Sequence, residues 1–267
     1  MSKQGRKGEQ DCLLAERNGG LLTLAINRPD ANNAINNETR DALIEAFEAA
    51  ATDATVRVIV LTSVGDDAFS VGTDVAEIAT YTPAEAEALG EKVRQVYRAV
   101  SAIDVPVVAA IKGACLGAGF ELAMHADVRL ARGDARFGLP GINIGMVSSG
   151  AALGRLQRLC GVGSAAALAL TGGMVTAERA FMLGLVSNVT SPKDFISALE
   201  QLALHFSALS PIAVVETKRM LRAAAEGGVE AASALGPKAL ARCFGEGDAL
   251  ARLQMMLGGR DPQATLH

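Results

Sequence analysis

The chain has 267 residues, of which half are hydrophobic and 4% aromatic, with no Trp and a formal net charge of −4. This length suits one large domain or one domain with an appendage, and its core must be packed from small aliphatic side chains. Charges of both signs are spread along the chain without a basic stripe, which argues against nucleic acid as a partner. No apolar run approaches the roughly 20 residues of a membrane span, so we predict a cytoplasmic protein with no membrane segment.

The cysteines and histidines show no spacing typical of a disulfide framework or a metal site. We therefore expect reduced, packed thiols and no metal. The first residues, 1–10, are largely charged or polar and lack an apolar stretch long enough for a signal peptide. We interpret them as a flexible N-terminus.

Strand and helix patterns alternate over the first 140 residues. Runs of β-branched and other apolar residues predict strands, and apolar residues at helical spacing predict helices. The predicted strands are 20–28, 56–64, 105–111, 127–132 and 135–140, and the predicted helices are 37–52 and 83–103. Thr82 and Glu85 flank Pro83 in a capping-box pattern at the start of the second helix. The segments 27–36 and 65–74 are predicted to be loops.

From about Ser148 the pattern is helical nearly to the end, with helix starts expected at Ser191–Pro192 and Ser210–Pro211. This order predicts an α/β core over residues 11–200 and a helical region over residues 201–267. The polar face of the last helices is thin, so we expect this region to pack against another subunit.

The segment LGAGFELAMHAD, residues 116–127, follows the predicted strand 105–111. Its glycines, Gly117 and Gly119, predict a tight turn that opens a helix. The first N–H groups of that helix carry partial positive charge, so a negative group should lie there. That group is either a phosphate or an oxygen that becomes negative during a reaction.

The phosphate alternative is the weaker one. The segment matches only the first half of the dinucleotide-binding pattern, and Leu122 stands where the third glycine is expected. Neither Asp127 nor Asp134 ends a second strand–helix unit, as the acidic residue of that pattern does. The oxyanion alternative needs a second N–H from a neighbouring turn, and FSVGTD (69–74) supplies a glycine-containing turn after the strand 56–64.

At this point five segments resemble the crotonase family, also called the enoyl-CoA hydratase/isomerase family. They are NRPDANNAIN (27–36), AFSVGTD (68–74), VPVVAAIKGACLGAGFELAMHADVRLA (105–131), ARFGLPGINIGM (135–146) and LTGGMVTAERAFMLGLVSNV (170–189). The resemblance implies an α/β fold of stacked ββα units followed by a C-terminal helical trimerisation region. It also implies a homotrimer or a hexamer (a dimer of trimers), an acyl-CoA thioester as substrate, and no cofactor.

The resemblance further implies an oxyanion hole formed by the backbone N–H groups of Val71 and Ala118, with Glu121 as an acid–base carboxylate. The loops 27–36 and 69–76 would hold coenzyme A. The other substrate-binding residues that it implies are Arg28, Ala34, Ser70, Gly72, Thr73, Asp74, Gly117, Gly141 and Met146. Arg28 or Lys112 could meet the phosphates of coenzyme A, although a lone surface cation is more often only solvated.

The family's second glutamate falls on position 141, which is Gly141 in this chain. The usual hydratase and isomerase mechanisms therefore each lose a proton carrier. Candidate replacements are Asn143, Ser148, Ser149, Tyr81, Tyr97 and His125, although the two serines could only cap a helix and His125 is expected to point away or pack. The residues expected to line the acyl pocket are Ile78, Tyr81, Val93 and Tyr97.

Three functions follow from this pattern. The first is hydration or dehydration of an enoyl-CoA with Glu121 as the sole carboxylate. The second is isomerisation or decarboxylation of an acyl-CoA. The third is acyl-CoA binding without catalysis.

Overall fold

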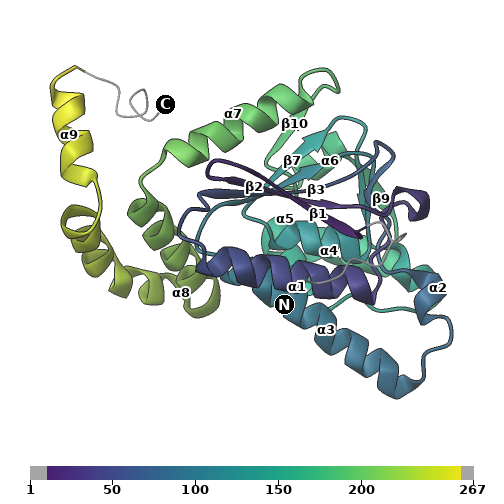
Figure 1. Ribbon diagram of the computed structural model, residues 1–267. Helices are drawn as coiled ribbons and strands as arrows, with labels where there is room; N and C mark the ends of the chain where they lie inside the picture. Colours follow the sequence, from purple (N-terminus) through teal and green to yellow (C-terminus); the bar gives the residue numbers. More distant parts are fainter. Residues whose placement is uncertain (1–10, 260–267) are drawn as a thin grey trace, which may run out of the picture.

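The structure, a computed structural model, describes residues 11–259. Two β-sheets and the helices around them form its body (Figure 1). The first sheet has the strand order β1-β2-β3-β5-β7-β10 and the second the order β4-β6-β8-β9. Neighbouring strands are parallel except in the pairs β1–β2 and β8–β9. The strands are β1 (Leu13–Asn18), β2 (Leu21–Ile26), β3 (Val58–Ser63), β4 (Ala68–Ser70), β5 (Val107–Ile111), β6 (Ala114–Leu116), β7 (Val128–Arg132), β8 (Arg136–Gly138), β9 (Met174–Thr176) and β10 (Asn188–Thr190).

A strand–strand–helix unit recurs along the chain. Each unit, β3-β4-α3, β5-β6-α4 and β7-β8-α5, gives one strand to each sheet before its helix. The fold thus confirms the predicted stacked ββα units. The helices are α1 (Asn37–Thr52), α2 (Val75–Ile78), α3 (Pro83–Ala102), α4 (Ala118–His125), α5 (Gly150–Thr171), α6 (Ala177–Met182), α7 (Phe195–Ala208), α8 (Pro211–Gly245) and α9 (Ala249–Leu257), with 3-10 turns η1 (Pro29–Ala31) and η2 (Pro140–Ile144).

Helices α1 and α3 begin where the sequence predicts because residues next to each start cap the helix with their side chains. The side chain of Asn36 accepts a hydrogen bond from the backbone N–H of Thr39. At α3 the capping box of Thr82 and Glu85 is complete in both directions. Ser210 is the N-cap of α8, as predicted, and Pro211 is its first residue.

Several other expectations were wrong. The predicted loop 65–74 contains β4, the predicted strand 135–140 ends at Gly138, and the helical stretch after Ser148 is interrupted by β9 and β10. These strands have only three residues, which is too short for a periodic pattern. Helix α7 begins at Phe195 rather than at Pro192, because residues 192–194 form a turn. Ser191 donates a hydrogen bond to the side chain of Asp194 within this turn.

The two faces of the first sheet carry separate apolar layers. The larger layer lies between the sheet and helices α1, α3 and α4 and includes Phe47, Val100 and Phe120. On the other face, α7 packs against β3, β5 and β7 through Phe195 and Ala203. The predicted domain boundary at residue 200 therefore falls inside a helix that covers the sheet. The four cysteines are free, and Cys12 and Cys115 are buried.

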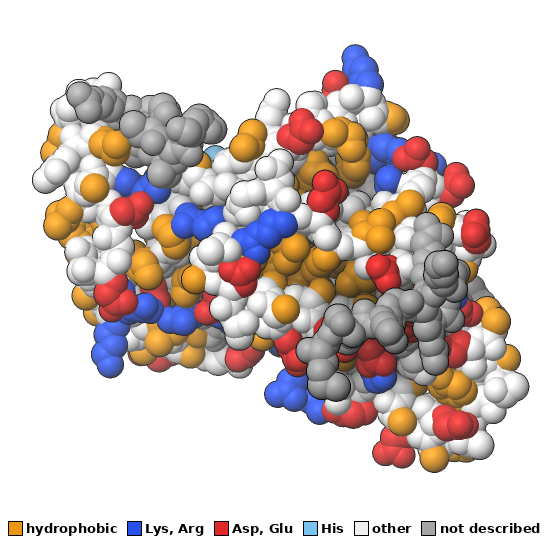
Figure 2. Space-filling model, viewed as in Figure 1, with side chains coloured by type: hydrophobic (Ala, Val, Ile, Leu, Met, Phe, Trp, Pro, Cys, Tyr) orange, Lys and Arg blue, Asp and Glu red, His pale blue; other side chains and the backbone are white. Residues whose placement is uncertain are grey.

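Helices α8 and α9 extend from the body as an arm (Figure 1). Lys218 ties the base of the arm to Asp127 at 2.6 Å, and Arg222 donates to backbone carbonyls of residues 101–103, at the end of α3. Charges of both signs are interspersed with apolar side chains along it (Figure 2). Its exposed large apolar residues are Leu221, Val229, Leu235, Leu240, Phe244, Leu250, Leu253, Met256 and Leu257.

Within residues 11–259 no single helix has both the length and the apolar composition to cross a membrane. Helices α7 and α8 meet those two criteria only when taken together, and they are bent by 102° at their junction.

Candidate active site

Two glycine-containing turns meet at the ends of β4 and β6. Gly72, in the first turn, has a φ of +105°, and a Cβ atom there would lie 3.1 Å from the Leu116 carbonyl oxygen and 3.2 Å from the Ala118 nitrogen. Gly117, in the second turn, has a φ of +49°. Both glycines are needed because L side chains rarely adopt these backbone angles and because the turns approach so closely. The structure thus brings the predicted pair Val71 and Ala118 onto adjacent turns.

The two backbone donors of this pair differ in the resting protein. Ala118 is the first residue of α4, so its N–H has no acceptor within the helix. Val71 N–H, by contrast, donates to the carbonyl oxygen of Asn32 at 3.2 Å. Asn32 and Asn33 hold this carbonyl in place with left-handed backbone angles, φ 49° and φ 56°.

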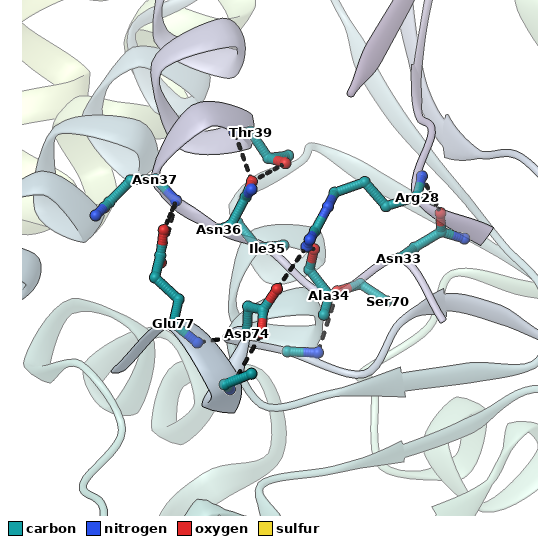
Figure 3. A network of polar contacts seen from close by, with 12 residues as sticks. Arg28, Asn33, Ala34, Ile35, Asn36, Asn37, Thr39, Ser70, Asp74 and Glu77 are labelled. Carbon is teal, nitrogen blue, oxygen red and sulfur yellow. Dashed lines mark hydrogen bonds and ion pairs between the residues drawn. The ribbon is translucent and has the colours of Figure 1, made fainter. Parts of the chain in front are cut away.

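The loop before α1 and the turn after β4 are joined by a polar network (Figure 3). Arg28 Nη1 donates to the Ala34 carbonyl at 2.5 Å and to Asp74 Oδ2 at 2.9 Å. Asp74 also caps α2 by accepting the N–H groups of Ala76 and Glu77. Arg28, Ala34 and Asp74 therefore interact with one another rather than standing free at the surface.

Other predicted binding residues also hold the turns. Ser70 is fully buried, and its Oγ accepts the Gly72 N–H at 3.1 Å. Thr73 forms a backbone bridge with Ile35. Lys112 lies 3.6 Å from a carboxylate oxygen of Asp66. The side chains of Ser70 and Lys112 thus have partners within the protein, whereas Thr73 contributes through its backbone.

Glu121 lies one helical turn after Ala118, and its side chain is enclosed. The residue is 5% exposed, and its Oε2 accepts hydrogen bonds from the Tyr97 hydroxyl at 3.1 Å and from the Ser149 N–H at 3.3 Å. Burial raises the pKa of Glu121, while hydrogen bonds from Ser149, Ser148 and Tyr97 offset part of that rise. A carboxyl with a raised pKa is suited to exchange protons near neutral pH.

The predicted replacements for the second glutamate fall into two groups. Tyr97, Ser148 and Ser149 meet Glu121, and Ser149 is also the N-cap of α5. The other three candidates do not meet it. The hydroxyl of Tyr81 accepts from Asn37 Nδ2 at 2.7 Å, and the side chain of Asn143 lies against Gly172.

His125 packs, as expected, instead of pointing at the carboxylate. Its ring stacks on Tyr97 with centroids 4.6 Å apart, and its Nδ1 lies 2.9 Å from Ser101 Oγ. Burial, and then the positive charges of Arg155 and Arg129, lower the pKa of His125 to about 3. The imidazole is therefore neutral at physiological pH.

Gly141, where a second carboxylate was expected, has room for a side chain. It lies in η2, and its carbonyl accepts the Met146 N–H at 2.9 Å. A Cβ atom at residue 141 would lie 3.6 Å from Met146 Cβ and 3.7 Å from the Met146 carbonyl oxygen, which is ordinary contact.

A small cavity borders Tyr97 and Ala118. Its volume is about 10 Å³, and its lining residues are Ile35, Arg40, Leu43, Val93, Val96, Tyr97, Ala118 and Leu122. Val93 and Tyr97, two of the residues predicted for the acyl pocket, line it, whereas Ile78 and Tyr81 do not. The sequence analysis did not include Arg40 among the candidate residues, although a cation on the apolar face of the helix 37–52 could have indicated it.

A larger cavity of about 250 Å³ lies between the end of α1 and the α7–α8 junction and contains none of the predicted site residues. In the part of the chain from residue 11 to 259, no group of three or more His, Cys, Asp or Glu side chains could hold a metal ion.

Comparison with known proteins assigns the family. The model of the enoyl-CoA hydratase/isomerase family matches residues 16–262. The short-chain-enoyl-CoA hydratase of Clostridium acetobutylicum is 30% identical over 90% of this chain and 92% of its own, and the 2,3-dehydroadipyl-CoA hydratase of Escherichia coli is 36% identical over 82% and 85%. The crystal structure of an enoyl-CoA hydratase from Mycobacterium smegmatis superposes with a TM-score of 0.90 at 32% identity, covering 95% of this chain and 98% of the other. The chain therefore belongs to the crotonase, or enoyl-CoA hydratase/isomerase, family and is an acyl-CoA enzyme of that family.

Proposed function

We propose that this enzyme adds water across the α,β double bond of an enoyl-CoA thioester, or removes it, with Glu121 as its sole catalytic carboxylate. The observation that carries the proposal is the enclosed Glu121 carboxyl, one turn after the Ala118 N–H and bonded to Tyr97 and Ser149. Burying a carboxyl costs folding free energy, so the presence of a buried carboxyl at this point supports a catalytic role. The hydratase names of the relatives agree with this reaction class.

The thioester oxygen would accept the N–H groups of Ala118 and Val71, the latter in exchange for the Asn32 carbonyl. These donors would stabilise the enolate oxygen as the reaction proceeds, and losing one such donor typically lowers the rate by about 10²–10³. Both donors belong to the backbone, so the side chains at these positions can vary.

A single carboxylate can complete the addition. Ionised Glu121 accepts a proton from water as the water oxygen bonds to the β-carbon and the double-bond electrons move into the thioester enolate. Protonated Glu121 then returns that proton to the α-carbon, and the carbonyl reforms. The Tyr97 hydroxyl would hold the carboxyl in place through both steps. The substrate is the coenzyme A ester itself, and this sequence of steps needs no further cofactor.

We also propose that copies of this chain assemble through the arm into a trimer or a hexamer in the cytoplasm. The apolar side chains along α8 and α9 support this, because a monomer would leave them in water. Sedimentation equilibrium would give a mass of three or six chains, and a monomer at micromolar concentration would contradict the proposal.

The first test is crotonyl-CoA turnover by the purified protein, followed by the loss of enoyl-thioester absorbance. Glu121→Gln should reduce turnover at least about 10²-fold, since a positioned acid–base group contributes that much. The affinity of the variant for butanoyl-CoA should persist. No turnover by the unaltered protein despite binding of butanoyl-CoA would refute hydration. Malonyl-type and 3-enoyl thioesters would then test decarboxylation and isomerisation, and inactivity with all of them would leave a binding protein.

A further inference from the structure

Arg40 lies on the face of α1 that otherwise presents apolar side chains to the core. Its neighbours on that face, Leu43 and Phe47, are fully buried, and Arg40 itself is only 1% exposed. A charged side chain at this depth is stable only where its N–H groups have acceptors.

Two of the three guanidinium nitrogens are satisfied. Nη1 donates to Asn37 Oδ1 at 3.2 Å and to Glu77 Oε2 at 3.1 Å, and Nη2 donates to the Ile35 carbonyl at 2.8 Å. Nε is buried and has no acceptor within the described residues. The ion pair with Glu77 explains how the buried charge is tolerated, but it does not explain why the Nε–H group lacks an acceptor.

The small cavity beside Ala118 offers the place for an acceptor. Among residues 11–259, Arg40 is the only charged residue that lines it, and neither Asn37 nor Glu77 does. Nε is the one Arg40 nitrogen without an acceptor among the described residues, so we take it as the donor for a group in the cavity. The rest of the lining is apolar apart from Tyr97, whose hydroxyl already serves Glu121. At about 10 Å³ the cavity holds one group the size of a water molecule.

We propose that this cavity receives a neutral oxygen, a hydroxyl or a carbonyl, carried by the acyl chain beyond its α and β carbons. The inference rests on the proposed function, because a thioester held at Ala118 places its acyl chain beside the residue that borders the cavity. The oxygen takes the place of one water and accepts the Nε–H of Arg40. A methyl group at the same point leaves that N–H unpaired, so the site discriminates against it.

A carboxylate fits this cavity less well than a hydroxyl. Glu77 already neutralises the guanidinium, so a second carboxylate would add an uncompensated charge at a buried site. A carboxylate also has two oxygens, and the cavity has room for one small group.

The test compares the affinities of saturated acyl-CoA esters by titration calorimetry. The pairs are butanoyl- with 4-hydroxybutanoyl-CoA, pentanoyl- with 5-hydroxypentanoyl-CoA, and hexanoyl- with 6-hydroxyhexanoyl-CoA. At the chain length whose oxygen reaches Nε, the hydroxylated ester should bind about 10-fold more tightly, as expected for one hydrogen bond to a charged donor. No preference at any of the three lengths would overturn the proposal.

Three variants separate the Arg40 contact from a structural effect. Arg40→Met removes the donor and should abolish the preference, whereas Glu77→Gln breaks the ion pair, keeps Nε and should retain it. Should Arg40→Met fail to fold, Val93→Phe fills the cavity and should abolish the preference with Arg40 intact. A preference that persists in Arg40→Met or Val93→Phe overturns the proposal.

Charged esters complete the test. Succinyl-, glutaryl- or adipoyl-CoA binding more tightly than the hydroxylated ester of the same length would overturn the assignment of a neutral oxygen. Because none of these esters can be hydrated, the result does not depend on crotonyl-CoA turnover. Failure of the proposed hydration and failure of the Arg40 contact are thus distinguishable.

Discussion

Restoring a carboxylate at residue 141 should raise hydratase activity. Gly141→Glu meets no steric obstacle, because a Cβ atom there comes no closer than 3.6 Å to its neighbour, and residue 141 does not have left-handed backbone angles. Replacing glycine at such a position also reduces the freedom of the unfolded chain, so stability should hold or rise by about 0.4–1 kcal/mol. A second positioned acid–base group contributes about 10²–10⁴ in rate, so kcat for crotonyl-CoA should rise by about 10² or more.

Gly141→Gln is the matched control, because glutamine has nearly the same shape but cannot exchange a proton. Initial rates of both variants would be measured by enoyl-thioester absorbance at saturating crotonyl-CoA, and their thermal unfolding would confirm the fold. A folded Gly141→Glu variant no faster than the Gln variant would refute the reasoning. It would mean that residue 141 does not face the reacting carbons or that its surroundings do not suit a second proton carrier.

Tyr97→Phe should lower kcat about 10-fold and move the acid limb of the pH–rate profile upward, because the lost hydroxyl holds down the pKa of Glu121; an unmoved limb would speak against this contact. His125→Phe should reduce the loss of folding stability at acid pH. The folded pKa of His125 is about 3 against an ordinary 6.5, so its contribution to stability is lost as pH falls below 6.5, by about 2 kcal/mol at pH 5. Urea unfolding at pH 8 and pH 5 would measure the difference between the variant and the unaltered protein, and equal losses would contradict the assignment. Gly72→Ala should cost about 1–3 kcal/mol and impair turnover, because it strains the turn beside Ala118; an unchanged melting temperature would show that the turn tolerates a side chain.

The sequence predicted best those elements whose signals are local. Helix α1 has the predicted bounds, and α3 differs by one residue, because a cap and a continuous apolar stripe mark each of them. The short strands β4, β6, β9 and β10 escaped prediction because three residues carry no periodicity and are held by their neighbours in the sheet. Strand β1 is six residues long but lies at the edge of its sheet with most residues exposed, so its polar composition concealed it.

The same division between local signals and contacts made only in the folded protein applies to the site. The glycines indicated the two turns, and the resemblance to the crotonase family was what paired Val71 with Ala118. The partners of Glu121 were harder to foresee, because Tyr97 and Ser149 come from helices that meet α4 only in the folded core. No pattern in the sequence distinguishes the Tyr97 hydroxyl, which reaches the carboxyl, from the Tyr81 hydroxyl, which accepts a bond from Asn37.

In the proposed mechanism, the bond between Val71 N–H and the Asn32 carbonyl affects how strongly this donor distinguishes the transition state from the substrate. A thioester carbonyl that displaces another carbonyl from this donor exchanges one neutral acceptor for a similar one and gains little. An enolate oxygen carries more negative charge, so the same exchange favours it strongly. Releasing the Asn32 carbonyl costs the same in both states, so the exchange nearly cancels the gain of the substrate carbonyl and leaves a net gain for the enolate oxygen; only this difference between the two states accelerates the chemical step.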